Sequence, residues 1–373
     1  MSTLKPVIQR VLPQTVAIIA PRQETLNALA KQAEQTGQKT MVIPPNGAGV
    51  IIDKAGYIIT NNHVVDGALE DKLAVLDTNG VTHKATLVGR SPTADIAVLK
   101  IEPFDGMAVA TYGDSDTLET GDSVFAIGNP MGMDASVSVG IISHPMRFLR
   151  PWQASYKRVT ALPVAQFDAA CNPGNSGGGL FNEKGELVGI NTFILTAQVE
   201  TVPTQQFPMA LYGTAMGHVG LNMALKSNGV KNVVNLIMNG NEQPANHHSL
   251  FKLSGGTPTQ TRAFQQFPSA TIDVVSAEGT KAGFKRGDCL QAIAGEAVQN
   301  AFHAEALLIK YAAQTVDITL VRKGQKADVT LNVTLPSLTI ITGLTSQAVS
   351  ERAEELGYLS EASAKTKNPK DKK

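Results

Sequence analysis

One serine of this 373-residue chain lies in a setting that chemistry explains better than packing does. Ser176 is embedded in the stretch Asn172-Pro-Gly-Asn-Ser-Gly-Gly-Gly179. Glycine adds no side chain to a core and costs conformational entropy, so such a cluster indicates positive φ angles or a close approach of the backbone to another group. A serine held there is a candidate nucleophile. We expect the oxyanion hole in Gly174, Asn175 and Ser176, with the N–H groups of Gly174 and Ser176 as the donors.

Two candidate partners for this serine precede it in the chain. His63 follows the predicted strand Tyr57–Thr60, and Asp95 precedes the apolar run Ile96–Leu99. A carboxylate beside a buried strand needs a partner. In a His-Asp-Ser triad the serine attacks a carbonyl, the histidine takes and returns the proton, and the aspartate fixes the imidazole tautomer. We predict that His63, Asp95 and Ser176 form such a triad.

The order of these residues separates two hydrolase designs. The stretch Gly174–Gly178 also satisfies the G-x-S-x-G pattern of α/β-hydrolases, but that turn requires a helix after the serine and places the acid and the histidine later in the chain. Here the residues after Ser176 predict another hairpin, over Leu180–Ile190. The order His, Asp, Ser is that of chymotrypsin-type proteases. A non-proteolytic acyl hydrolase is therefore disfavoured.

Other reactive side chains are assigned structural roles. A histidine taken alone is more often a surface or core residue than a catalyst, and this interpretation applies to all six histidines other than His63. Cys171 lies close to Ser176, but a lone cysteine is most often a small apolar core residue. Cys289 falls in a different predicted domain, so no disulfide is expected.

The elements that must position the triad are predicted strands. A hairpin is expected over Gly49–Thr60, and residues 22–37 are weakly helical. The apolar stretch Val11–Ala20 is interpreted as a first strand. Further strands are predicted at residues 84–88, 96–101, 123–127 and 137–142. This spacing is typical of an all-β sandwich or a pair of barrels.

Composition excludes several classes of partner. The chain is 43% hydrophobic and 17% charged, which fits a globular protein of two or three domains. Because 32 Lys and Arg balance 32 Asp and Glu, there is no electrostatic footprint for nucleic acid or an anionic membrane, and a protein or peptide partner is favoured. No 18-residue apolar stretch occurs, so no membrane span is expected. Neither a metal nor another cofactor is expected.

Four segments resemble the HtrA, or Deg, family of serine proteases. They are Gly56–Val65, Ala94–Ile101, Ala126–Pro130 and Asp168–Gly178. The resemblance implies a mostly β fold, with a chymotrypsin-like double β-barrel followed by a PDZ domain. It also implies a homotrimer or a multiple of trimers, and ATP-independent degradation of misfolded proteins.

The resemblance also divides the chain. We expect a protease domain over residues 1–238, a linker at 239–246, a PDZ domain over 247–336, and a short helix with a lysine-rich tail over 337–373. The PDZ match depends on Ala282–Asp288 and Ala294–Val298. Such a domain binds peptide C-termini by strand addition. Its expected carboxylate-binding loop consists of Leu250, Phe251, Lys252 and Leu253.

The primary substrate pocket is predicted to be apolar. In chymotrypsin-type folds the residue six positions before the nucleophile lies at the pocket floor, and here it is Ala170, so no carboxylate awaits a Lys or Arg side chain. Small or medium aliphatic side chains are expected to fit. The expected walls are Asn191, Thr192, Phe193, Gly220, Leu221 and Asn222.

The sequence predicts a serine endopeptidase of protein quality control and the stress response. The alternative is a catalytically latent chaperone or regulatory scaffold with the same fold, held inactive by residues 196–218, which correspond to an activation loop in the family. The absence of a recognisable export signal indicates the cytoplasm for the sequence as it stands. The family resemblance indicates the periplasm or another extracytoplasmic compartment.

Overall fold

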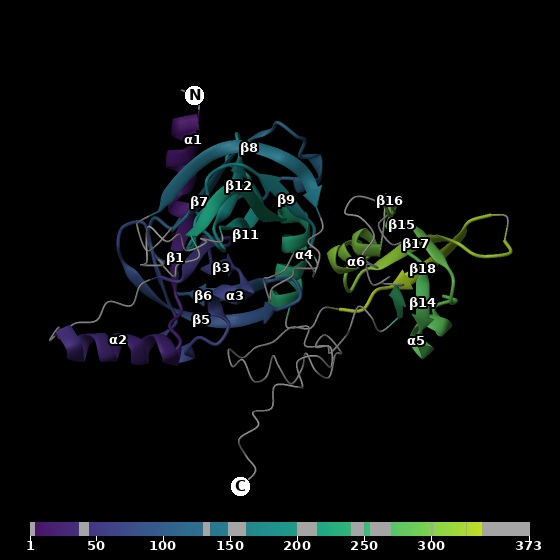
Figure 1. Ribbon diagram of the computed structural model, residues 1–373, viewed down its shortest axis with the longest axis horizontal. Helices are drawn as coiled ribbons and strands as arrows, with labels where there is room; N and C mark the ends of the chain where they lie inside the picture. Colours follow the sequence, from purple (N-terminus) through teal and green to yellow (C-terminus); the bar gives the residue numbers. More distant parts are fainter. Residues whose placement is uncertain are drawn as a thin grey trace, which may run out of the picture.

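Two closed six-stranded β-barrels form the larger part of the computed structural model (Figure 1). The structure describes residues 4–36, 45–129, 135–147, 162–199, 215–239, 250–253, 270–299, 301–325 and 327–337. The first barrel has the strand order β1-β2-β3-β6-β5-β4 and the second β10-β11-β12-β9-β8-β7. The predicted double β-barrel is therefore confirmed.

The strands of the first barrel are β1 (Thr15–Ile19), β2 (Gly47–Ile51), β3 (Tyr57–Thr60), β4 (Ala74–Leu76), β5 (Thr82–Ser91) and β6 (Ile96–Ile101). Those of the second are β7 (Ser123–Gly128), β8 (Ser136–Arg147), β9 (Val164–Phe167), β10 (Gly179–Asn182), β11 (Leu187–Val199) and β12 (Ala215–Lys226). Every pairing within the barrels is antiparallel. The strands predicted around residues 84, 96, 123 and 137 are all present.

Strand β3 is apolar on both of its faces because it separates two cores. Ile58 points into the core of the first barrel, whereas Ile59 points into the cluster between the barrels, and both are fully buried. The same alternation along β6 sends Leu99 into the barrel and Val98 toward the seam. Burying each such side chain stabilises the fold by about 1.5–3 kcal/mol. The ends of β3 and β6 are consequently fixed at the seam.

The N-terminus corrects one prediction. Residues 4–11 form helix α1 (Leu4–Val11), followed by a 3₁₀ turn at Leu12–Gln14, so the predicted first strand is confined to β1. The apolar residues of α1 recur at helical spacing and pack against the cluster between the barrels. The helix lies on the β10–β11 turn, where a Cβ added to Gly185 would come within 2.8 Å of Val11.

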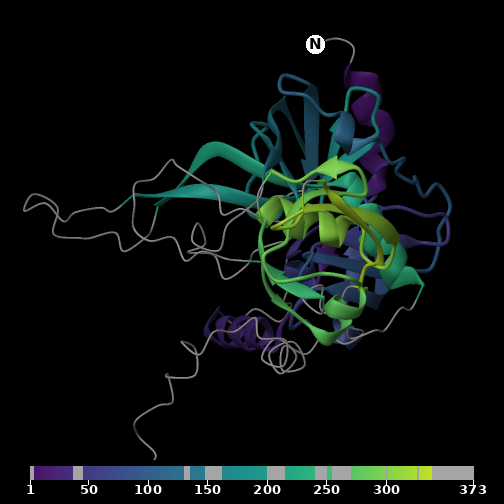
Figure 2. The same cartoon turned by 90° about the vertical axis from the view of Figure 1, so that its right-hand side faces the viewer.

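Two further segments extend from the barrels. Helix α2 (Gln23–Thr36), which the weak helical signal predicted, projects from the first barrel in both ribbon views (Figures 1 and 2). Strands β11 and β12 continue beyond the second barrel as a two-stranded arm (Figure 2). Thr196 pairs with His218 and Val199 with Ala215, so the ends of the expected activation loop are strand, and residues 200–214 lie outside the described part of the chain.

A smaller unit follows the barrels. It contains a two-stranded sheet, a four-stranded sheet in the order β16-β15-β17-β18, and its own hydrophobic core. Its elements are β13 (Phe251–Leu253), β14 (Ile272–Val275), α5 (Ala277–Lys281), β15 (Cys289–Ile293), β16 (Glu296–Ala297), α6 (Ala301–Lys310), β17 (Thr315–Val321) and β18 (Val329–Thr334). The expected helix at 346–356 lies outside the described residues.

Helix α4 (Ser227–Met238), which the sequence analysis missed, connects this unit to the barrels. It packs on β5, β6 and β11, and its outer side contacts α6 (Figure 1). Ile309 and Ala312 are fully buried in the same cluster as Val233 and Ile237 of α4. The smaller unit is thus docked through an apolar contact.

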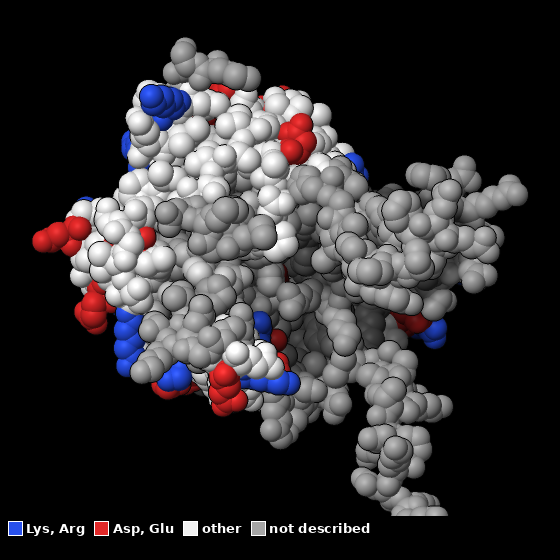
Figure 3. Space-filling view, turned by 60° about the vertical axis from the view of Figure 1, so that its left-hand side comes forward, with Lys and Arg blue, Asp and Glu red and all other residues white. Residues whose placement is uncertain are grey.

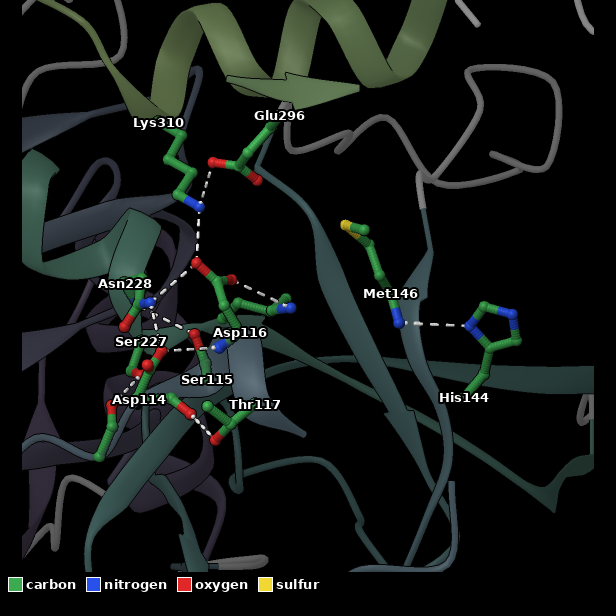
Figure 4. Close-up of polar contacts among 12 residues, drawn as sticks. Asp114, Ser115, Asp116, Thr117, His144, Met146, Ser227, Asn228, Glu296 and Lys310 are labelled. Atoms are coloured by element: carbon green, nitrogen blue, oxygen red, sulfur yellow. Dashed lines mark hydrogen bonds and ion pairs between the residues drawn. The ribbon is translucent and has the colours of Figure 1, made fainter. Parts of the chain in front are cut away.

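Ion pairs lie at one edge of this contact between the barrels and the smaller unit (Figure 4). Lys310 of α6 lies 2.6 Å from Asp116 of the barrels and 2.8 Å from Glu296 of β16. Burial alone would raise the pKa of Asp116, but hydrogen bonds from Lys310 and Asn228 lower it to about 2. Lys226 approaches the other Asp116 oxygen at 3.2 Å. Asp116 is therefore the shared anion of the contact.

Replacing Lys310 with Met is expected to loosen the docked unit. The ammonium group is mostly buried, so its loss leaves Asp116 and Glu296 without their bridge and weakens docking by about 1–2 kcal/mol. Hydrogen exchange of the α4 and α6 amides measures this change. The matched control is Arg286→Met, which removes a solvent-exposed pair with Asp273 and should leave those amides unchanged. Equal protection in both variants contradicts the prediction.

Glu305 of α6 predicts a fall in stability with rising pH. Burial raises its pKa to about 7 from an ordinary value of 4.5. Between these values the unfolded chain ionises first, so the native state binds more protons and the free energy of unfolding falls as pH rises. The loss is on the order of 2 kcal/mol by pH 8. Urea titrations at pH 4.5 and 8 should show a smaller decrease for Glu305→Gln than for the unmodified protein.

Charged side chains of both signs lie on the face of the molecule shown in Figure 3. On the face shown in Figure 3, Lys and Arg side chains of the described residues lie among Asp and Glu side chains, without a large patch of one sign. In the described part of the chain, no helix combines the length and apolarity needed to cross a bilayer.

Candidate active site

His63 and Asp95 are brought into contact by the ends of β3 and β6. The short helix α3 (Asn62–Val65) follows β3 directly and presents His63, while Asp95 immediately precedes β6. Asp95 Oδ2 lies 2.8 Å from His63 Nδ1, and Asp95 Oδ1 accepts a hydrogen bond from the His63 backbone N–H at 3.0 Å. One carboxylate therefore fixes both the ring and the main chain of the histidine.

Asp95 is itself held firmly. Its φ of 53° lies in the left-handed region, which Asp tolerates better than most residues. Asn61 Nδ2 donates to the Asp95 carbonyl at 2.9 Å, and Thr192 Oγ1 donates to Asp95 Oδ2 at 2.9 Å. The side chain is 7% exposed. These bonds orient the carboxylate toward His63.

The nucleophile loop lies against the segment that carries His63. The Ala48 N–H donates to the Ser176 carbonyl at 2.8 Å. A Cβ added to Gly47 would meet both Val64 at 2.8 Å and the Ser176 carbonyl at 2.9 Å. Thr192, which binds Asp95, lines the same small cavity as Ser176. The structure thus gathers the three predicted triad residues from three separate elements.

No hydrogen bond joins the His63 ring to the Ser176 hydroxyl among the contacts of the described residues. Catalytic hydrogen bonds are often long in the absence of substrate and tighten when it binds. No helix follows Ser176, because the chain enters β10 at Gly179. An α/β-hydrolase elbow, by contrast, has a helix directly after the nucleophilic serine.

The backbone of the nucleophile loop leaves two N–H groups available. The Asn175 N–H donates to the Asn172 carbonyl at 3.0 Å, so it is already engaged. The N–H groups of Gly174 and Ser176 have no acceptor among the described residues. Gly174 has a φ of 104°, and its carbonyl accepts a hydrogen bond from the Asn129 N–H at 3.4 Å. Of the three expected oxyanion-hole residues, two present free donors and Asn175 does not.

A small cavity beside Ser176 is lined by two of the residues expected in the substrate pocket. Its volume is about 10 Å³, room for about one water molecule. Asn191 and Thr192 line it as expected, but Ala170 is exposed to solvent and does not. The remaining lining residues are Phe167, Cys171, Asn175, Ser176 and Met223. Cys171, the residue after Ala170, is thus one of the residues that line this cavity.

The other expected pocket residues have different environments. Asn222 is fully buried and donates to the Ala169 carbonyl at 2.8 Å, so it braces the strand that leads to the nucleophile loop. Gly220 and Leu221 are half-buried, and the Phe193 side chain lies outside the described residues. Burial raises the pKa of Cys171 to about 11, so its thiol is neutral near pH 7. A neutral thiol is a poor nucleophile.

The expected peptide-binding loop forms the start of the smaller unit. Leu250 and Phe251 are buried in its core, where the Phe251 ring packs edge-on against Phe284 with centroids 4.8 Å apart. Leu253 is half-buried and pairs with Ile272 of β14. The Lys252 side chain lies outside the described residues.

The fold of the two barrels is that of the trypsin-like peptidases. Residues 47–190 match the family model of the trypsin-like peptidase domain. The matched range includes His63, Asp95 and Ser176.

The chain belongs to the HtrA family of serine proteases. It is 34% identical to a serine protease Do-like HtrA of Lactobacillus helveticus, over 76% of this chain and 67% of the relative. It is also 34% identical to a probable periplasmic serine protease do/HhoA-like of Haemophilus influenzae, over 77% of this chain and 58% of the relative. The chain thus spans 58% and 67% of the length of these two relatives.

Solved structures support the same assignment. The HtrA-type protease AlgW with a tripeptide is 26% identical with a TM-score of 0.58, over 89% of this chain and 97% of that one. A serine endoprotease from Yersinia pestis is 25% identical with a TM-score of 0.52, over 90% and 98% of the two chains. Because these likenesses cover both the barrels and the smaller unit, the HtrA fold extends over most of the chain.

Proposed function

We propose that this protein is a serine endopeptidase that cleaves unfolded or misfolded polypeptides. The observation that carries the proposal is the Asp95 carboxylate, which binds both the ring and the backbone of His63 beside a nucleophile loop with two available N–H donors. The relatives named as serine proteases support the same activity.

The proposed reaction gives each of these groups one role. Ser176 Oγ attacks the scissile carbonyl while His63 Nε2 takes its proton, and Asp95 holds the Nδ1–H and stabilises the imidazolium. The N–H groups of Gly174 and Ser176 stabilise the oxyanion, each by roughly 3–4 kcal/mol. His63 then protonates the leaving amine, and water attacks the acyl-enzyme by the same route in reverse. The small cavity beside Ser176 favours a small acyl-side residue.

We divide the chain into a part that cleaves the substrate and a part that binds peptides. We assign residues 1–238 to the protease domain, 239–246 to a linker, 247–336 to a PDZ domain that binds peptide C-termini, and 337–373 to a tail. The AlgW structure with a tripeptide supports peptide binding by such proteins. A homotrimer or multiple of trimers, working in an extracytoplasmic compartment, is the assembly proposed. The relatives named as periplasmic support that compartment.

A second candidate is a latent scaffold with the same fold. The observation that favours it is the missing hydrogen bond between His63 and Ser176 among the described contacts. In this form the enzyme would need a bound peptide or partner before the triad closes.

A fluorophosphonate probe and an unfolded protein substrate test both proposals. We expect labelling at Ser176 and cleavage that falls on the order of 10⁴- to 10⁶-fold in Ser176→Ala. Ser136→Ala, which changes an exposed serine on β8, serves as the matched control and should retain both properties. An unlabelled, inactive protein that prevents aggregation would instead support the scaffold.

A further inference from the structure

The one-turn helix α3, which carries His63, depends on contacts from outside itself. It has four residues, and its N-cap Asn61 makes no side-chain capping bond, while the amide of that side chain binds the Asp95 carbonyl. A single turn leaves most of its terminal N–H and C=O groups without partners inside the helix, and helices this short are marginal in isolation. The orientation of the His63 backbone is therefore set by neighbouring segments.

Arg22 supplies two of these contacts at the end of α3. Its Nη2 donates to the His63 carbonyl at 3.1 Å, and its Nε donates to the Asp66 carbonyl at 2.8 Å. The planar guanidinium presents its donors in a fixed fork, so the two carbonyls are held at one spacing. Its positive charge is also favourable near the C-terminal end of a helix. Because both acceptors are main-chain atoms, the contact restrains the backbone of α3.

The backbone of Arg22 is itself anchored on both sides. The preceding residues Ala20 and Pro21 are buried, and the Pro21 carbonyl accepts a hydrogen bond from the Leu69 N–H at 2.9 Å. On the other side, the Arg22 carbonyl accepts from the Leu26 N–H, in the first turn of α2, at 3.1 Å. The guanidinium therefore reaches α3 from a fixed base.

A second arginine holds the same turn through side chains. Arg90 of β5 is fully buried, and its Nη1 donates to Asn62 Oδ1 at 3.0 Å and to Asp66 Oδ1 at 2.7 Å. Asn62 is the first residue of α3, and Asp66 directly follows its last residue. Arg90 thus fixes the two ends of α3, and Arg22 binds His63 itself.

The peptide groups on both sides of His63 are consequently restrained. Its N–H donates to Asp95 Oδ1 at 3.0 Å, and its carbonyl accepts from Arg22. The Cα–Cβ bond of His63 therefore has a fixed direction, and Asp95 Oδ2 then fixes the rotation of the ring. We propose that Arg22 is a positioning residue, which holds the His63 imidazole in the orientation that proton transfer from Ser176 requires. The inference rests on the proposed endopeptidase function.

Arg22→Met is expected to lower kcat by about 10- to 100-fold and to leave KM within about twofold. Methionine donates no hydrogen bond, so the His63 carbonyl is released while the groups that bind the substrate stay in place. A shift of about 1 Å in a reacting group can cost about 100-fold in rate. Steady-state kinetics with a peptide substrate measure the effect, at a temperature well below the thermal unfolding transition of each variant.

Two matched variants separate orientation from charge and from general effects of losing an arginine. Arg22→Lys keeps the charge but lacks the planar fork that holds both carbonyls, so kcat should stay at least about fivefold below that of the unmodified protein. Arg10→Met removes an exposed arginine that donates to the Lys184 carbonyl, and should leave kcat within about twofold. Full activity in Arg22→Lys, or a loss confined to KM in Arg22→Met, overturns the inference.

A spectroscopic measurement separates this inference from the proposed function. The His63 Nδ1–H proton, which Asp95 accepts, gives a low-field NMR resonance that is identified by its absence in His63→Ala and requires no turnover. In Arg22→Met its exchange with solvent should be at least about 10-fold faster, whereas Arg10→Met should leave it unchanged. This result supports positioning even when the unmodified protein cleaves nothing. The absence of the resonance from the unmodified protein, or an unchanged resonance in Arg22→Met, overturns the inference.

Discussion

Replacing Asp95 with Asn is expected to lower kcat about 10⁴-fold while the fold stays intact. The amide keeps the size of the carboxylate and tolerates the positive φ of this position. Asparagine has a single acceptor oxygen, so it cannot accept hydrogen bonds from the His63 ring, the His63 backbone and Thr192 as the two carboxylate oxygens do. The imidazole therefore loses the partner that fixes its tautomer and its orientation. Steady-state kinetics with a peptide substrate, together with a thermal unfolding curve, measure the effect.

Two comparisons isolate the role of the carboxylate. Asp53→Asn makes the same change on an exposed hairpin turn and should leave kcat within about twofold. The double variant with Ser176→Ala should be no slower than Ser176→Ala alone, because the members of a triad act as one unit. An additive loss in the double variant would mean that Asp95 acts outside the triad.

The second large effect is expected at Gly177. Its φ is 86°, and an added Cβ would lie 2.2 Å from the Ala48 carbonyl and 2.3 Å from Thr60 Oγ1. Gly177→Ala must therefore move the backbone as well as bear the left-handed conformation. We expect a loss of about 3 kcal/mol or more in the free energy of unfolding. Because a shift of about 1 Å can cost about 100-fold in rate, activity should fall by at least that factor.

Gly106→Ala is the matched control for this substitution. Gly106 has a similar φ of 82°, but an added Cβ would meet no atom within 4 Å. Only the conformational cost of about 1–2 kcal/mol remains, and activity should not change. If urea titrations show the same loss of stability for both variants, close packing around the nucleophile loop is not the reason that position 177 needs a glycine.

The sequence predicted best those elements whose signal is local. Strand β6 is present over the same residues as predicted, because its apolar run is bounded by Asp95 and by the polar residues after Ile101. Helix α1 was not predicted, and the first strand was predicted to begin at Val11 and not at Thr15, since valine and isoleucine favour strands. Helix α4 follows β12 without a capping signal, and its N-cap residue makes no side-chain capping bond.

For the site, residue type and order were enough to select His63 and Asp95, which the structure places in contact. The carboxylate support from Thr192 was not predictable, because a threonine in a strand has no local signal and acts here across 97 positions of sequence. The same holds for Asn129, whose contact with Gly174 depends on how the second barrel closes. The place of Ala170 at the floor of the substrate pocket stays a prediction, since the structure shows only that its side chain is exposed.

The alternating burial along β3 and β6 has a consequence for how the molecule unfolds. Each strand contributes successive side chains to the core of the first barrel and to the seam between the barrels. Neither core can lose its order while the other keeps it, because both depend on the same backbone. The two barrels should therefore melt as one cooperative unit, with a single transition reported alike by backbone and side-chain probes.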